Sequence, residues 1–455
     1  MSDQLSCFKA YDIRGRVPDE LDEELAHAIG RAYVALKGAR RVAVGKDMRL
    51  SSDAIAGALC EGINAMGADV VDIGLSGTEM IYFAAAHLEA EGVDGGIAVT
   101  ASHNPADYNG MKLVSAGAVP ISGDSGLKDI ESMVATGQAP SGSGGGHVET
   151  LDIMDAYTDH LLSMVDIPSL KPFTLVTNPG NGCAGMVIDA LENRLPFSFH
   201  KVHHDPDGTF PNGVPNPLLV ENRQPTVDAV LRHEANLGIA WDGDFDRCFF
   251  FDHQGEFTDG YYMVGLFAQE LLAQHPGSRI LYEPRLTWNT IELVSQSGGE
   301  AILTKTGHAF IKERMRAEDA VYGGEISAHH YFRDFAYCDS GMIPWLLLTQ
   351  LMSRTGQSLA DLVADRKARF PNSGEINLTI ANPTAALAEV RARSGEQAIA
   401  FDETDGLAFD FPDWRFNVRM SNTEPVVRLN VETRGDPQLL SQQTDEVVSL
   451  LQSLA

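Results

Sequence analysis

Residues 42–74 read VAVGKDMRLSSDAIAGALCEGINAMGADVVDIG and contain two strand patterns with a helical pattern between them. The stretch opens with an apolar strand pattern at 42–47, continues through a helical period from Ala54 to Met66, and closes with a second strand pattern at 68–74. A strand, a polar loop, a helix and a strand within about 30 residues match the length of one βαβ crossover. The stretch therefore predicts two parallel strands with a helix packed on their sheet.

The same pattern occurs twice more along the chain. One copy runs from Thr174 in TLVTNPG through a helical stretch to FSFHKVHHD, and another runs from Arg279 in RILYEPR to EAILTKTG. Three copies predict three related α/β domains with mixed, mostly parallel sheets. The alternative is chance recurrence, because βαβ units are common in unrelated domains.

Three interruptions suggest where these domains end. Ala139–Gly146 reads APSGSGGG, which is typical of a flexible linker, and the second interruption follows the strand pattern FFFD near Asp252–Gly255. The third is FPNSG at 370–374, after which EINLTI and VVRLNVE alternate apolar and polar residues, with helical periods between them. That last pattern predicts a smaller C-terminal α+β domain. The predicted domains are 1–146, 147–252, 253–368 and 369–455.

Composition excludes several classes of function. Asp and Glu number 63 and Lys and Arg number 34, so the formal net charge is 34 − 63 = −29. This charge argues against nucleic-acid and anionic-membrane partners. The five scattered cysteines form no CxxC pair, so neither a disulfide framework nor a zinc site is expected. Since the chain has neither an apolar run of about 18 residues nor an apolar leader, we expect a cytoplasmic protein.

A serine loop is the first motif that carries chemistry. TASHNP at 100–105 follows the strand pattern GGIAVTA, and Asn104-Pro105 and Asn109-Gly110 predict turns around it. Ser102 is therefore expected on a tight loop at the carboxyl end of a strand, where ligands of parallel sheets gather. Its hydroxyl suits a nucleophile or a phosphate carrier, and a capping serine in a rigid loop is the alternative. His103 is expected to point away from Ser102.

An acidic triplet is the second motif. WDGDFDR at 241–247 lies between the strand patterns LGIA and CFFF. Asp242, Asp244 and Asp246 repel one another unless a cation lies between them, and on a loop they can converge on one hard divalent ion. A solvated acidic turn is the alternative, but the apolar flanks favour a buried metal-binding loop.

The third motif is the glycine-rich stretch GGEISAHH at 323–330. Glycine permits close approach of the backbone, and Glu325 and Ser327 offer acceptors for sugar hydroxyls. Gly307-His308, just before the helical stretch AFIKERM, is expected on the same surface. An ordinary glycine-rich turn is the alternative.

The fourth motif is RMSNTEP at 419–425, followed by Arg428. Small hydroxyl side chains, loop amides and two guanidiniums suit a phosphate cradle. A polar hairpin turn is the alternative.

Together these motifs resemble the α-D-phosphohexomutase family. The resemblance begins at KAYDIRG (9–15), continues through TASHNP and DGDFDR, and ends at RMSNTEP, so it covers nearly the whole chain. It implies four domains around a central cleft, each contributing one motif. Within the family, the loop GGEISAHHYF is most similar to that of bacterial phosphomannomutases, while Arg285 stands where several relatives carry lysine.

The resemblance also implies a role for each motif residue. Ser102 matches the phosphoserine, and its phosphoryl group joins Asp242, Asp244 and Asp246 as magnesium ligands. Arg14 and Lys112 match basic residues near the reacting groups, and Lys112 is the first candidate for the proton acceptor, ahead of His329 and His103. The implied substrate-binding residues are Arg247, His308, Glu325, Ser327, Arg419, Ser421, Asn422, Thr423 and Arg428.

The implied reaction interconverts mannose 6-phosphate and mannose 1-phosphate through a phosphoserine, with Mg²⁺ as cofactor and a hexose 1,6-bisphosphate as intermediate and activator. The nearest alternative is the same chemistry on glucose phosphates, or on both sugars. More distant alternatives are a phosphatase with Asp242 or Asp244 as nucleophile and a non-catalytic sugar-phosphate binding protein. The expected partner is a sugar phosphate, not nucleic acid or a membrane, and the chain is expected to be a monomer or homodimer.

Overall fold

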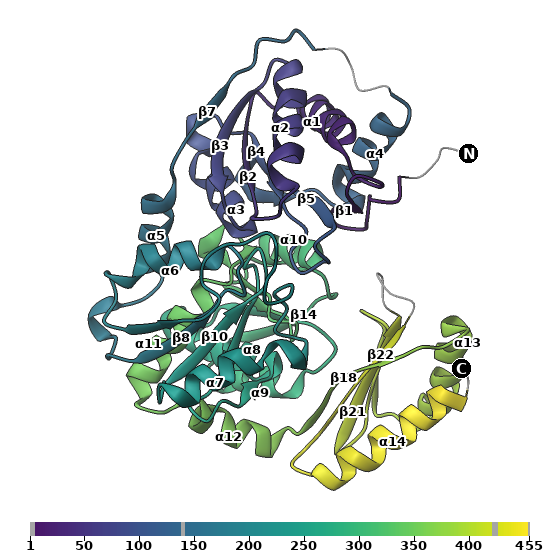
Figure 1. Cartoon of the computed structure of the whole chain (residues 1–455). Coiled ribbons are helices and arrows are strands. Elements are labelled where there is room, and N and C mark those ends of the chain that lie inside the picture. The colour runs from purple at the N-terminus through teal and green to yellow at the C-terminus, as the bar shows by residue number, and fades with distance from the viewer. Residues whose placement is uncertain (1–4, 138–141, 421–425, 454–455) are drawn as a thin grey trace. The chain divides into compact units, whose positions relative to one another are not determined.

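The structure is a computed structural model that describes residues 5–137, 142–420 and 426–453. The chain divides into two compact units. The first unit holds Met1–Phe257 with His329–Gly356, and the second holds Thr258–Ala328 with Gln357–Ala455. Figure 1 labels most of their helices and many of their strands.

A mixed sheet organises the N-terminal part of the first unit. Its order is β1 (Ile13–Arg16), β5 (Tyr108–Ser115), β4 (Gly95–Val99), β2 (Arg41–Lys46), β3 (Asp69–Leu75) and β7 (Val148–Thr150), with β6 (Val119–Pro120) paired to β5. The run from β4 to β7 is parallel, whereas β5 is antiparallel to both β1 and β4. Because α2 (Ser52–Ala65) connects the parallel strands β2 and β3, the crossover predicted from residues 42–74 is confirmed.

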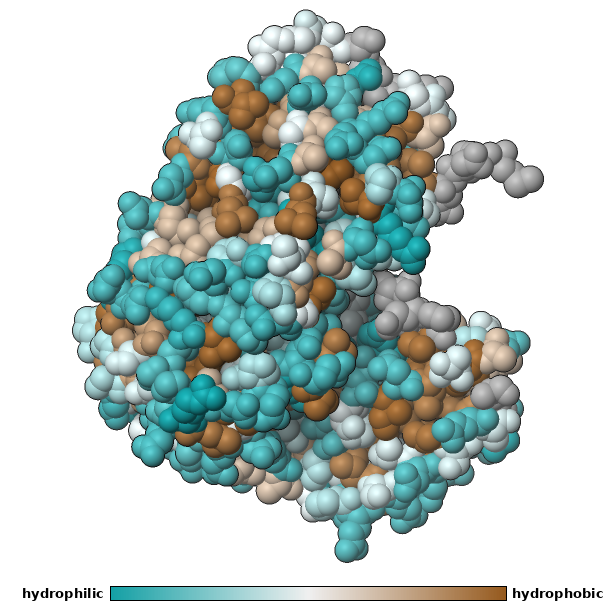
Figure 2. All heavy atoms as spheres, viewed as in Figure 1, coloured by the Kyte–Doolittle hydropathy of each residue, from teal (hydrophilic) through white to brown (hydrophobic). Residues whose placement is uncertain are grey.

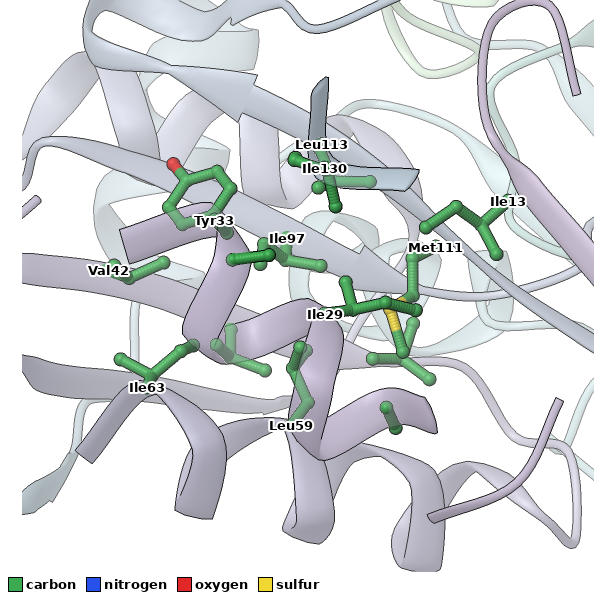
Figure 3. Packing of buried hydrophobic residues seen from close by; sticks show 14 of the residues in the cluster. Ile13, Ile29, Tyr33, Val42, Leu59, Ile63, Ile97, Met111, Leu113 and Ile130 are labelled. Carbon is green, nitrogen blue, oxygen red and sulfur yellow. The ribbon is translucent and has the colours of Figure 1, made fainter. Parts of the chain in front are cut away.

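Helices α1 (Glu23–Lys37) and α2 bury their apolar faces against this sheet (Figure 3). Ile29 and Tyr33 are one helical turn apart on α1, as are Leu59 and Ile63 on α2, and all four side chains are fully buried. α4 (Lys128–Ala135) adds Ile130 to the same core. α3 (Thr78–His87) packs on β4 and β2 outside this cluster.

A second sheet lies in the following part of the first unit. Its order is β12 (Phe257–Thr258), β11 (Cys248–Phe251), β10 (Leu237–Trp241), β8 (Thr174–Asn178) and β9 (Ser198–Lys201). α6 (Ala184–Glu192) joins the parallel strands β8 and β9, which confirms the second predicted crossover. The unit also contains α5 (Met154–Ser163), α7 (Gln224–Arg232), β16 (His330–Phe332), β17 (Cys338–Asp339) and α11 (Ile343–Thr355).

The third predicted crossover lies in the second unit and is also confirmed. α9 (Trp288–Gln296) joins the parallel strands β13 (Arg279–Tyr282) and β14 (Glu300–Leu303), and β15 (Tyr322–Gly324) lies parallel to β13 on its other side. The accompanying helices are α8 (Gly260–Gln274), α10 (His308–Glu318) and α12 (Leu359–Arg369).

The C-terminal part of the second unit is an antiparallel sheet covered by two helices, as the α+β prediction requires. The strand order is β18 (Asn372–Leu378), β22 (Val427–Thr433), β21 (Trp414–Met420), β20 (Leu407–Asp410) and β19 (Ala400–Asp402). α13 (Pro383–Ser394) and α14 (Pro437–Ser453) share one core with the sheet, built from residues such as Val390, Phe409 and Leu451.

One local prediction is wrong. Asn109-Gly110 was expected to form a turn, but both residues lie inside β5. Asn109 is fully buried, and its amide donates to the hydroxyls of Ser51 and Ser52. A Cβ at Gly110 would lie 2.1 Å from the carbonyl oxygen of Ile13, so glycine is needed here because β1 approaches closely.

The predicted boundaries remain predictions. β7 starts just after residue 146 and still pairs with β3 of the first sheet. Residues 139–141 of the predicted linker lie outside the described residues.

Hydrophilic residues cover most of the face shown in Figure 2, with small hydrophobic groups between them. Among the described residues, none of the helices has both the length and the apolar character needed to cross a bilayer.

Candidate functional site

Ser102 lies on the loop between β4 and β5 and is 2% exposed. Its Oγ donates a hydrogen bond of 2.6 Å to Asp242 Oδ2 and lies 2.9 Å from His103 Nδ1. The expectation that His103 points away is therefore wrong. The reason is the backbone of Ser102, whose φ of +48° is left-handed and breaks the alternation of neighbouring side chains.

Arg49, which sequence analysis missed, shapes this loop from the end of β2. Its fully buried guanidinium donates four hydrogen bonds of 2.6 to 3.0 Å to backbone carbonyls. The acceptors are the carbonyl oxygens of Ser102, Asn104, Pro105 and Tyr108. Asp47 connects Arg49 to the start of the serine loop. Its carboxylate accepts a hydrogen bond from Thr100 Oγ1 at 2.8 Å and lies 3.3 Å from Arg49 Nε. The available signal was the position of KDMR at the carboxyl end of a predicted strand.

The acidic triplet lies on the loop between β10 and β11. Asp242, Asp244 and Asp246 are buried, and each contributes a carboxylate oxygen to a group whose members lie within 4.8 Å of one another. A Cβ at Gly243 would lie 2.5 Å from the carbonyl oxygen of Ser102, so this glycine lets the acidic loop pack directly against the serine loop.

Two cations neutralise part of this charge. Lys112 of β5 places Nζ 2.8 Å from Asp244 Oδ2 and also contacts Asp246, while Arg247 Nη2 donates to Asp242 Oδ2 at 2.8 Å. Burial alone would lower the pKa of Lys112, but Asp244 and Asp246 outweigh it and raise that pKa above its ordinary value. Likewise, burial alone would raise the pKa of Asp242, yet Arg247 holds it below its usual range. Lys112 and Asp242 are therefore both charged at neutral pH.

The donor set fits a hard divalent cation. Oδ1 of Asp244 is buried and has no hydrogen-bond partner among the described residues, which is unfavourable for an ionised carboxylate unless a cation compensates. Burial and the neighbouring Asp246 raise the pKa of Asp244, as expected where like charges crowd together. Three carboxylates on one loop are ligands that magnesium prefers.

Arg14 and His329 also reach this region. Arg14 of β1 donates from Nη1 to Asn104 Oδ1 at 2.6 Å, which places its guanidinium beside the serine loop. His329 forms a backbone bridge with Arg247, and its Nε2 lies 3.6 Å from Asp246 Oδ1. The first unit thus brings together Ser102, Arg14, Lys112, Asp242, Asp244, Asp246, Arg247 and His329.

A second group of predicted residues lies in the second unit. Glu325 accepts a 3.0 Å hydrogen bond from the backbone N–H of Gly307, directly before His308 and α10, so these two motifs do share one surface. Arg285 Nη2 lies 3.5 Å from Ser327 Oγ. Glu283, which sequence analysis missed, is buried and accepts from Arg285 Nε at 2.7 Å and from the Ile326 N–H at 3.2 Å.

The predicted phosphate cradle is described only at its two edges. Arg419 of β21 and Arg428 of β22 are directly opposite each other in the antiparallel register. Both guanidiniums lie 3.4 Å from the carboxylate of Glu375 on β18. Ser421, Asn422 and Thr423 lie outside the described residues.

Comparisons with known proteins agree with this geometry. Models of the phosphoglucomutase/phosphomannomutase family match α/β/α domain I at residues 6–140, domain II at 155–255, domain III at 259–370 and the C-terminal domain at 375–450. A phosphomannomutase of Salmonella montevideo is 58% identical over 99% of both chains. A protein of Xanthomonas campestris described as phosphohexose mutases is 57% identical over 98% of this chain and 99% of its own.

A solved structure supports the same assignment. A phosphoglucomutase/phosphomannomutase family protein from Burkholderia thailandensis has a TM-score of 0.89 and 33% identity, and the match covers 100% of this chain and 98% of that one. All four domain models of one family match in chain order, and relatives over the full length are more than half identical. The chain therefore belongs to the phosphoglucomutase/phosphomannomutase family.

Proposed function

We propose that the protein is a phosphomannomutase, which interconverts mannose 6-phosphate and mannose 1-phosphate through a phosphorylated Ser102. The observation that carries the proposal is the 2.6 Å hydrogen bond from Ser102 Oγ to Asp242 within the buried carboxylate group. The full-length similarity to the phosphomannomutase of Salmonella montevideo supports mannose as the sugar.

The reaction consists of two phosphoryl transfers. In the first, the P–O bond to Ser102 breaks while a P–O bond to a sugar hydroxyl forms. That hydroxyl gives its proton to a base of the protein, and the departing Ser102 Oγ takes up a proton. This gives a hexose 1,6-bisphosphate, which turns around and returns its other phosphoryl group to Ser102 by the reverse steps. Such transfers depend mainly on positioning and charge stabilisation. Arg14, Lys112 and Arg247 supply positive charge from the protein.

Asp242, Asp244 and Asp246 would hold Mg²⁺, together with a phosphoryl oxygen on Ser102. The ion would supply neutralisation of the charge on the transferred group.

The proton acceptor is better assigned to a histidine than to Lys112. A general base must be unprotonated before it accepts a proton, and the raised pKa of Lys112 keeps it as an ammonium. Burial and the neighbouring Arg247 lower the pKa of His103 to about 4, so this imidazole is neutral at neutral pH. His329, 3.6 Å from Asp246, is the second candidate.

The other residues that the sequence singled out are proposed to bind the remainder of the substrate. Glu325, Ser327 and His308 suit the sugar hydroxyls. The substrate's non-reacting phosphate would be bound by Arg419, Ser421, Asn422, Thr423 and Arg428. Because guanidinium forks bind phosphate oxygens in either orientation, one such clamp serves both halves of the reaction.

Replacement of the nucleophile is the decisive test. We expect Ser102→Ala to abolish mannose 1-phosphate turnover in a coupled assay supplied with catalytic hexose 1,6-bisphosphate. The exposed Ser132→Ala is the matched control and should retain wild-type activity. Mass spectrometry of the wild type should place phosphate on Ser102. Phosphate on Asp242 or Asp244 would favour the phosphatase alternative, while affinity without turnover would favour a binding protein.

The metal proposal has its own test. Asp244→Asn keeps the shape of the side chain but removes a ligand charge, so we expect half-maximal activation to need more than about tenfold more Mg²⁺, with a lower kcat. The exposed Asp129→Asn is the control. An unchanged magnesium titration would contradict the assignment.

Sugar preference is decided by comparing kcat/KM for mannose 1-phosphate and glucose 1-phosphate. A larger value for glucose would replace the proposal by its nearest alternative.

We further propose a cytoplasmic location, domain boundaries near 146, 252 and 368, and activation by hexose 1,6-bisphosphate. We also propose a monomeric or homodimeric state, which sedimentation would determine.

A further inference from the structure

Three guanidiniums converge on one carboxylate in the second unit. Glu375 Oε2 lies 3.2 Å from Arg285 Nη1 and 3.4 Å from Arg419 Nη2, and its Oε1 lies 3.4 Å from Arg428 Nη1. The Arg285 and Arg419 side chains are only 4% and 7% exposed, whereas those of Glu375 and Arg428 are 24% and 20% exposed. The carboxylate therefore lies where a group arriving from solvent can reach it.

The strand register explains why this carboxylate is needed. Arg419 and Arg428 are directly opposed on neighbouring antiparallel strands, and opposed like charges destabilise a sheet. Burial lowers the pKa of Arg419, and the positive charge of the nearby Arg285 lowers it further. Glu283 compensates Arg285, and Asp405 Oδ2 lies 3.9 Å from Arg419 Nη1. Glu375 contacts all three arginines.

Glu375 is ionised in this position. Burial alone would raise its pKa, but Arg285, Arg428 and Arg419 together outweigh burial and lower it. A carboxylate and a phosphate bind guanidinium groups with the same fork geometry. The Glu375 carboxylate thus lies near one guanidinium nitrogen of each arginine, and these nitrogens are donors of the kind that phosphate binds.

We propose that Glu375 is an internal competitor of the substrate phosphate, holding Arg419 and Arg428 together when no phosphate is bound and weakening phosphate binding at this clamp. The inference rests on the proposed function, which assigns these arginines to the non-reacting phosphate. Moderate affinity would serve the reaction, because the bisphosphate must dissociate from this clamp and turn around between the two phosphoryl transfers. Removing the competing charge should therefore tighten binding, whereas removing a merely structural residue would loosen it.

The test is phosphate affinity in variants of the full-length chain. In a Ser102→Ala background, which prevents turnover, calorimetry measures the Kd of mannose 1-phosphate and of inorganic phosphate with and without Glu375→Gln. We expect Glu375→Gln to lower both Kd values about tenfold, equivalent to about 1.4 kcal/mol. With Ser102 intact, KM should fall while kcat stays equal or falls. Unchanged or weaker phosphate binding would overturn the proposal.

Two further variants make the result specific. Glu396→Gln removes the same charge from an exposed position of the C-terminal part and should leave Kd unchanged. Glu375→Asp keeps the negative charge but moves it away from the arginines by the length of one methylene group. Its gain in phosphate affinity should therefore be smaller than the gain in Glu375→Gln. If Glu375→Gln does not fold, Glu375→Asp decides alone, and weaker binding by it rejects the competitor role.

Failure of this proposal is distinguishable from failure of the proposed function. A wild type that turns over no hexose phosphate would reject the mutase assignment, yet the inorganic-phosphate titrations would still measure the effect of Glu375. Conversely, an active mutase whose affinity for phosphate drops in Glu375→Gln would reject the competitor role alone.

Discussion

Arg49 holds the Ser102 loop by donating to its backbone carbonyl oxygens rather than to its side chains. Four N–H donors of one buried guanidinium meet four carbonyl oxygens between Ser102 and Tyr108. This arrangement uses the rigid fork of arginine, which no other side chain reproduces. We therefore regard Arg49 as a positioning residue for Ser102.

Arg49→Lys tests that role. An ammonium has three donors on a flexible stem and cannot satisfy four carbonyls, so the serine loop should shift and kcat should fall about 100-fold, the scale associated with misplacement of about 1 Å. KM should change much less, because Arg49 is buried beneath the loop. Arg40→Lys, whose side chain is 84% exposed, is the control. Wild-type kcat in Arg49→Lys would show that the loop keeps its shape without the fork.

At the residue scale, the sequence identified candidate side chains for chemistry, but it did not predict how they face one another. Ser102 and the Asp triplet were predictable because reactive residue types followed apolar strand patterns. The contact between Ser102 and His103 was not, because it depends on one left-handed φ that no local rule assigns to serine. Asn109-Gly110 misled the prediction because burial against β1 overrides its turn preference.

At the element scale, helix α3 joins separate parts of the first unit through its first two residues. Thr78 Oγ1 donates to Asp244 Oδ2 at 2.6 Å, which fixes one predicted metal ligand. Glu79 is fully buried and accepts four hydrogen bonds of 2.5 to 3.2 Å from α5 and from the residues before α11. The donors are Tyr157 Oη, Ser340 Oγ, Gly341 N and Met342 N.

This carboxylate should make stability depend on pH. Burial raises the pKa of Glu79 from 4.5 to about 8, although its four hydrogen bonds oppose the shift. Between these values the folded chain keeps a proton that the unfolded chain releases. The free energy of unfolding should therefore fall as pH rises through this window, by at most about 1.4 kcal/mol per pH unit.

Glu79→Gln removes the titration while preserving the shape of the side chain. Urea unfolding near the lower and upper ends of the window should show that the stability advantage of the wild type over Glu79→Gln shrinks as pH rises. The exposed Glu61→Gln should follow the wild-type pH dependence. Parallel pH profiles for the wild type and Glu79→Gln would mean that Glu79 titrates outside this range.

The sequence predicted individual helices and strands better than the contacts between segments that are far apart in the chain. All three βαβ crossovers appear where the periodicity placed them, because a sheet-covering helix must repeat its apolar residues every three to four positions. No local sequence pattern predicted that His329–Gly356 belongs to the first unit, while the residues on either side of it belong to the second. Contacts such as Ser340 with Glu79 arise from tertiary packing, and residues 261 positions apart share no periodicity.

At the scale of the whole molecule, the second unit joins its two parts through buried polar groups. Glu432 of β22 is fully buried and accepts from the Thr287 N–H at 2.7 Å and from the hydroxyl of Tyr261 on α8. Arg415 of β21 donates to Glu432 Oε1 at 3.0 Å and to the carbonyl oxygen of Pro284 at 3.0 Å. The C-terminal sheet is thus connected to residues 258–328 at several points, although it has a hydrophobic core of its own.

Because that core is separate, cooperativity between the two parts should depend on this polar junction. Glu432→Gln removes the charge facing Arg415 and replaces one acceptor oxygen with a donor NH2 group, which should destabilise the junction by about 3 kcal/mol. Calorimetry should then resolve a transition at lower temperature that is absent from the wild type, as the C-terminal sheet unfolds before the rest of the unit. The exposed Glu446→Gln should leave the profile unchanged. If Glu432→Gln instead lowers the wild-type transition without dividing it, apolar contacts rather than this junction make the second unit unfold as one.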